Sequence, residues 1–146
     1  MIARNNPFNI RYVKANNWKG LTGQTKGFCN FETMDFGLRA GFILIRNYVY
    51  KKDLWTVENV LERFAPSSEN NTSAYISFVS DYLSSNGYNP NDLRNPWVLD
   101  FDKAFFCLCK AILRYESGFV LTYIDYLRVI TTFHIKKDLY GTFRDS

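Results

Sequence analysis

The sequence predicts a mainly helical single domain with a small β-hairpin near its N-terminus. Beyond residue 33, apolar side chains recur every three or four positions over most of the chain, as in helices that bury one face. Residues 1–27 instead contain three glycines and two Asn-Asn pairs, which are typical of turns. A chain of 146 residues, 47% hydrophobic and 18% aromatic, is long enough for one well-packed core.

We divide the chain into a hairpin and loop lobe (residues 1–33), a helical core (34–133) and a basic tail (134–146). Strands are expected at residues 8–12, where apolar and polar side chains alternate, and at residues 28–31. Helices are expected at residues 34–50, 56–64, 73–84, 100–117 and 122–133. The tail is expected to be loosely held.

The helix expected to end near Gly118 finishes on a carboxylic acid, Glu116. This residue lies four positions after Ile112 and so continues the apolar side of the helix. Loss of hydration there, together with the partial negative charge of a helix C-terminus, should raise the pKa of Glu116. A carboxyl group that stays protonated near neutral pH can act as a general acid. The alternative is a glutamate at a frayed helix end, pointing into water.

Two further charged residues bear on this acid. Glu69 comes just before a helix that Asn71 or Thr72 can cap, a position that favours the ionised carboxylate. Arg39 lies within the most apolar helix. A buried arginine is expected to pair with a carboxylate, here either Glu116 or Glu69. We favour an ordinary structural ion pair for Arg39, because such pairs commonly shift pKa values without taking part in chemistry.

Composition argues against several other chemistries. The chain has one histidine and no Cys-x-x-Cys pair, so we expect no metal and no cofactor. No glycine-rich loop of the nucleotide-binding kind is present. The formal net charge of +4 comes from scattered basic residues, which gives no reason to expect nucleic acid as a partner. A nucleophilic pair of Cys29 and His134, as in cysteine hydrolases of wall peptides, remains open.

Three cysteines, an odd number, indicate synthesis in a reducing compartment. The sequence shows no signal peptide and no apolar run of about 18 residues, so we expect a protein made in the cytoplasm that does not associate with membranes.

Several motifs resemble, in order, those of a family of bacterial and phage proteins that are often labelled structural and regarded as lysozyme-like. The motifs lie at residues 4–11, 18–20, 31–40, 63–66, 69–75 and 111–118, so the match covers roughly residues 3–120. The chain departs from the family pattern at four places, which are Phe8 for glycine, Phe64 for tryptophan, Asn71 for aspartate and Tyr115-Glu116-Ser117-Gly118 for His-Glu-Asn-Gly.

Two finer similarities concern the order of the motifs. Residues 112–119 resemble the segment of soluble lytic transglycosylases in which the catalytic acid precedes Ser-Gly-Phe. Residues 5–10 with Trp18 resemble a stretch of wall glucosaminidases that follows the acid in those enzymes. The resemblance therefore implies a lysozyme-like fold in circularly permuted order. The N-terminal hairpin would then pack beside the C-terminal end of the Glu116 helix and form a sugar-binding cleft.

The resemblance implies cleavage of peptidoglycan glycan strands, of the lysozyme or lytic transglycosylase type. Glu116 would be the catalytic acid and Glu69 a second acid. The residues expected to contact sugar are Trp18 and Tyr75 by stacking, and Asn6, Asn71 and Thr72 by hydrogen bonding. Each of these five also has a structural interpretation as a core ring or a helix cap. The competing hypothesis is a non-catalytic wall-binding or virion structural module with the same fold.

Action at the cell wall or in the periplasm would require delivery from the cytoplasm. We expect this to occur through a virion, a lysis programme or a specialised apparatus such as type VI secretion. The expected partners are peptidoglycan strands, a component of the virion or secretion apparatus and, for a secreted toxin, an immunity protein.

Overall fold

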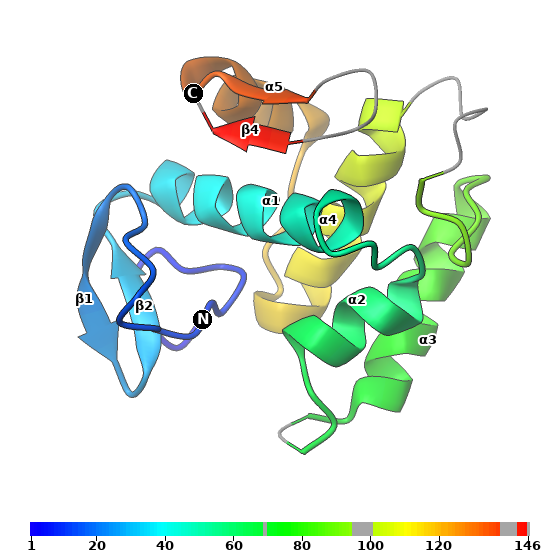
Figure 1. Cartoon of the computed structure of the whole chain (residues 1–146), viewed down its shortest axis with the longest axis horizontal. Coiled ribbons are helices and arrows are strands. Elements are labelled where there is room, and N and C mark those ends of the chain that lie inside the picture. The colour runs from blue at the N-terminus through cyan, green and yellow to red at the C-terminus, as the bar shows by residue number, and fades with distance from the viewer. Residues whose placement is uncertain (69, 95–100, 138–142, 146) are drawn as a thin grey trace.

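A computed structural model of the chain describes residues 1–68, 70–94, 101–137 and 143–145. This part of the chain contains five helices and two small hairpins (Figure 1). The elements are β1 (Leu21–Thr25), β2 (Phe28–Phe31), α1 (Met34–Tyr50), α2 (Val57–Phe64), α3 (Thr72–Ser85), α4 (Phe101–Ser117), α5 (Tyr123–Thr132), β3 (Ile135–Lys137) and β4 (Phe143–Asp145). The prediction of a mainly helical protein with a small N-terminal hairpin is confirmed.

Helix boundaries follow the capping residues. Four helices are preceded by a residue whose side chain accepts a hydrogen bond from the backbone N–H three positions later, namely Thr33, Thr56, Asn71 and Thr122. Gly118 follows α4 in the left-handed conformation, with φ of 74°. These ends agree with the sequence prediction to within one or two residues. Asp100, expected at the start of α4, lies outside the described residues.

The first expected strand, at residues 8–12, does not form, so that prediction was wrong. Asn9 has a φ of 52°, which breaks an extended conformation, and in the described chain a single bridge from Arg11 to Phe28 joins this segment to β2. The hairpin instead pairs β1 with β2 in antiparallel fashion. The alternation of apolar and polar residues arises because the loop buries Phe8 and Ile10 while remaining irregular.

The central helix is α1, which buries most of its side chains. In Figure 1 it runs across the middle of the molecule, with the N-terminal lobe beside its first turns, α5 and β4 along one side, and α2 at its other end. None of the helices in the described parts of the chain combines the length and apolar character needed to cross a bilayer.

The N-terminal loop rests directly on α1 at two glycines one turn apart. A Cβ atom on Gly37 would lie 1.9 Å from the carbonyl oxygen of Asn5, and one on Gly41 would lie 1.9 Å from the Phe8 ring. Glycine alone permits so close an approach of loop and helix. These contacts fix the position of the loop, and therefore of Asn9, relative to the helical core.

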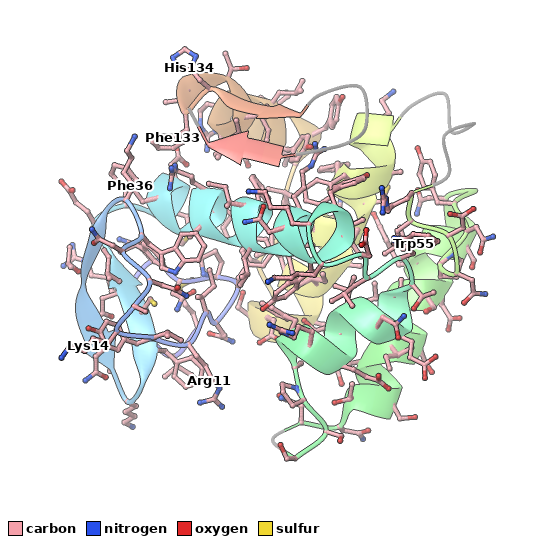
Figure 2. The ribbon with its side chains drawn as sticks, viewed as in Figure 1. Arg11, Lys14, Phe36, Trp55, Phe133 and His134 are labelled. Atoms are coloured by element: carbon pink, nitrogen blue, oxygen red, sulfur yellow. The ribbon has the colours of Figure 1, made fainter. Side chains whose placement is uncertain are left out.

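The C-terminal tail forms a second hairpin, in which β3 pairs with β4. The expectation of a loosely held tail was wrong for these described residues, because Ile135 is buried and β4 contacts α1. The end of α5 is also attached to α1, since the rings of Phe36 and Phe133 lie 5.2 Å apart (Figure 2).

Candidate active site

A groove of about 570 Å³ lies between the N-terminal lobe and α2. One wall comes from the lobe, the other from α2 and the loop after it, with further residues from α1 and the C-terminal end of α4. The lining includes Asn9, Arg11, Trp18, Tyr48, Arg63 and Glu116. The volume falls within the range of roughly 300–1,000 Å³ that is usual for small-molecule pockets.

Glu116 occupies the last turn of α4 and is half-buried at this groove. Burial raises the pKa of its carboxyl group above the ordinary value, against smaller opposing effects of Tyr75, Asn9 and Arg11. The helix does not fray here, because the Gly118 N–H donates to the Arg114 carbonyl oxygen at 3.0 Å. This direction of the pKa shift agrees with the expectation from the sequence, and the half-buried carboxyl group does not fit the alternative of a glutamate that points into water from a frayed end.

Asn9 ties the N-terminal loop to the end of α4. Its side-chain amide donates to the Glu116 backbone carbonyl at 3.1 Å and to Glu116 Oε1 at 3.2 Å. Next to this contact, the Ser117 hydroxyl donates to the Pro7 carbonyl at 2.7 Å. The expected packing of the N-terminal lobe beside the C-terminal end of the Glu116 helix is therefore confirmed.

Tyr75 lies behind the acid, not in the groove. Its side chain is only 1% exposed, and its ring stacks on Tyr115 with centroids 4.1 Å apart. Burial raises the pKa of Tyr75, and so does the neighbouring carboxylate of Glu116. The prediction that Tyr75 stacks on a sugar was wrong, because Tyr115 covers it. Tyr115 is itself 39% exposed and lines the groove.

The three polar residues expected to contact sugar instead bond to the protein backbone. Asn6 is fully buried, and its amide donates to the carbonyls of Ile10 (3.0 Å) and Cys29 (2.9 Å). Asn71 caps α3, and the buried Thr72 hydroxyl donates to the Ala65 carbonyl at 2.6 Å. The predicted roles of Asn6 and Thr72 were wrong because both side chains are buried and satisfy backbone groups. Asn71 is exposed, so its contact with sugar stays a prediction.

Two other predicted residues have different outcomes. Trp18 is half-buried and lines the groove, as a ring that binds sugar would have to do. Glu69, the expected second acid, lies outside the described residues.

Sequence reasoning missed the two arginines of the groove. Arg11 is the arginine whose charge lowers the pKa of the Glu116 carboxyl group. The guanidinium of Arg39, which the sequence suggested as a partner of Glu116 or Glu69, lies 5.9 Å from the centre of the Phe133 ring. Arg63 enters from the last turn of α2. Arg11 belongs to the motif at residues 4–11 and Arg63 to the motif at residues 63–66. Their place in these motifs was the one signal in the sequence for either residue.

The Cys29–His134 alternative receives no support from the geometry. The Cys29 side chain is 1% exposed, and burial raises the pKa of its thiol, which disfavours the nucleophilic thiolate. His134 is exposed at the outer surface beyond α5 (Figure 2).

Removing the Asn9 amide should raise the pKa of Glu116 further. Asn9→Gly keeps the left-handed backbone, which glycine adopts readily, and deletes a donor that favours the ionised carboxylate. A ¹³C NMR titration of labelled glutamate carboxyl groups measures the shift. Asn5→Gly is the matched control, because Asn5 also has a positive φ but donates to the backbone carbonyls of residues 31 and 32. A lower Glu116 pKa in Asn9→Gly would contradict this account.

No protein-family model matches the chain. The chain is 34% identical over 121 residues to "Protein P5" of Pseudoalteromonas phage PM2, and the alignment covers 80% of this chain and 70% of the phage protein. The phage connection implied by the motifs is thereby confirmed. An identity of this level, sustained over most of both chains, places this protein in one family with Protein P5 of phage PM2.

Proposed function

We propose that this protein cleaves the glycan strands of peptidoglycan and that Glu116 is the general acid that protonates the glycosidic oxygen. One observation carries the proposal, which is that the carboxyl group with a raised pKa also lines a groove. A general acid must both retain its proton near neutral pH and reach the ligand. A glutamate in the core meets the first condition alone, and a fully solvated one meets only the second.

The rest of the groove has the composition of a carbohydrate site. Rings line it at Trp18, Tyr48 and Tyr115, and side-chain amides at Asn9, Asn16 and Asn70. Aromatic faces pack against the apolar faces of sugar rings, whereas amides both donate to and accept from hydroxyl and acetamido groups. The lining therefore supports a polysaccharide ligand.

The residues around Glu116 also suit the second half of such a reaction. Once Glu116 has given up its proton, the Asn9 amide and the charge of Arg11 favour the resulting carboxylate. That carboxylate can then act as a base toward water or toward a sugar hydroxyl. Among the described lining residues Glu116 is the one carboxyl group, and a single acid suffices for the transglycosylase route.

The proposal includes a lysozyme-like fold in permuted order, supported by the packing of the N-terminal loop against the end of the acid-bearing helix. The phage relative favours delivery by a virion or a lysis programme over a secretion apparatus.

Digestion of purified peptidoglycan, followed by mass spectrometry of the soluble fraction, tests this function. We expect release of disaccharide muropeptides, with 1,6-anhydro ends for a transglycosylase and reducing ends for a hydrolase. Binding to the wall without release of soluble products would reject the enzymatic function and favour the non-catalytic wall-binding or virion module.

A further inference from the structure

Two guanidinium groups enter the groove from different walls, each lying on an aromatic ring that also lines it. The Arg11 guanidinium carbon lies 4.8 Å from the centre of the Phe28 ring, and that of Arg63 lies 5.8 Å from the centre of the Tyr48 ring. A guanidinium within about 6 Å of a ring centre is attracted to the ring, and its several N–H groups can serve as donors to an anion. Both arginines are therefore placed at the groove with donors that suit a carboxylate.

The described part of the groove lining carries more arginine side chains than carboxyl groups. Among the described lining residues Arg11 and Arg63 are the two cations, and Glu116 is the one acid. Since burial raises the pKa of Glu116, that carboxyl group offsets the arginine charges less than an ordinary glutamate would. A neutral polysaccharide gains little from the two arginine charges, whereas a glycan that carries carboxylates can pair with them.

Peptidoglycan and chitin have the same β-1,4-linked backbone of N-acetylated sugars. They differ because every second sugar of peptidoglycan carries a lactyl group, with a free carboxylate or an attached acidic peptide. We propose that Arg11 and Arg63 form an anion subsite through which the groove selects carboxylated glycan strands over neutral polymers of N-acetylglucosamine. This inference rests on the proposed function and specifies its substrate class.

The two arginines can be tested by binding alone, in a Glu116→Gln background that does not consume the ligand. The probes are a peptidoglycan tetrasaccharide with free lactyl carboxylates and chitotetraose, which lacks them, each titrated calorimetrically. We expect the carboxylated probe to bind at least about 10-fold more tightly. Arg11→Gln or Arg63→Gln should each weaken its binding by about 10-fold and leave chitotetraose unaffected. Added salt should weaken binding of the carboxylated probe only.

Lys14→Gln is the matched control. This substitution removes one positive charge from the N-terminal lobe, as Arg11→Gln does. Lys14 is exposed and does not belong to the groove lining. Figure 2 shows Lys14 on the side of the lobe away from α2 and Arg11 on the side toward it. This control should bind both probes as the background protein does. Arg11→Lys and Arg63→Lys keep the charge and should retain part of the preference, which separates lost recognition from lost folding.

The possible results separate this inference from the proposed function. Equal affinity for both probes, or an equal loss of both in the arginine variants, overturns the anion subsite even if the wild-type protein digests peptidoglycan. A preference for the carboxylated probe that depends on the arginines upholds the subsite, even if the wild type releases no muropeptides. Binding of neither probe overturns the anion subsite, and digestion of purified peptidoglycan then decides the proposed function alone.

Discussion

Glu116→Gln is expected to lower the rate of muropeptide release by about 100- to 10,000-fold, the usual contribution of a general acid. Glutamine keeps the shape of the side chain and an oxygen that can accept from Asn9, but it has no proton to give to a glycosidic oxygen. Initial rates on purified peptidoglycan measure the effect. Glu62→Gln is the matched control, because it removes an exposed acid beside Arg63 and should leave the rate unchanged. Equal rates for Glu116→Gln and wild type would exclude Glu116 as the acid.

Thermal stability gives a second signature of the same substitution. Burial raises the folded-state pKa of Glu116, so its contribution to stability is fully present below the unfolded-state pKa of about 4.3. That contribution is lost as the pH rises through the folded-state pKa. The glutamine side chain in Glu116→Gln does not ionise, so the variant should melt at the same or a higher temperature than wild type at neutral pH. The difference between the two melting temperatures should shrink below about pH 4. A variant that is inactive because it is unfolded would show the opposite.

Gly37→Ala should cause the largest loss of stability, with a decrease in the free energy of unfolding of about 3 kcal/mol. In an exposed helix alanine is favoured over glycine by about 1 kcal/mol, so any loss must come from the contact with the loop. The new Cβ would lie 1.9 Å from the Asn5 carbonyl oxygen, which is backbone and can move only with the whole loop. Displacement of the loop would also separate Asn9 from Glu116 and lower the activity. Urea denaturation measures the loss.

Gly41→Ala supplies the comparison, because its Cβ would meet the Phe8 side chain instead of backbone. A double-mutant cycle of Gly41→Ala with Phe8→Ala should therefore show favourable coupling, since truncating the ring removes the clash. A cycle of Gly37→Ala with Asn5→Ala should show none. Wild-type stability in Gly37→Ala would mean that the loop does not rest on α1 as described.

The helices could be predicted because their signals are local. The expected helix at residues 34–50 matches α1, and Thr33, Asn71 and Thr122 mark helix starts through contacts three residues away. The same reasoning fails at residues 8–12, because alternating burial occurs both in a strand and in an irregular loop that rests on glycines. The sequence has no comparable signal for the packing of the C-terminal hairpin against α1.

The half-buried position of Glu116 was predictable for the same reason as the helix, since Glu116 follows Ile112 by one turn. Its surroundings were not, because they come from segments far apart in the chain. The stacked pair of Tyr75 and Tyr115 illustrates this, as only the packing of α3 on α4 decides which ring is covered. Arg11 and Arg63 likewise meet at one groove through tertiary structure alone.

The central claim is that Glu116 retains its proton at the groove. The most direct test is the ¹³C NMR titration of glutamate carboxyl groups in the labelled wild-type protein, with the Glu116 signal assigned from its absence in Glu116→Gln. We predict that Glu116 titrates above the ordinary glutamate value of about 4.3, owing to burial. Titration at or below that value would contradict the account of Glu116 as a general acid.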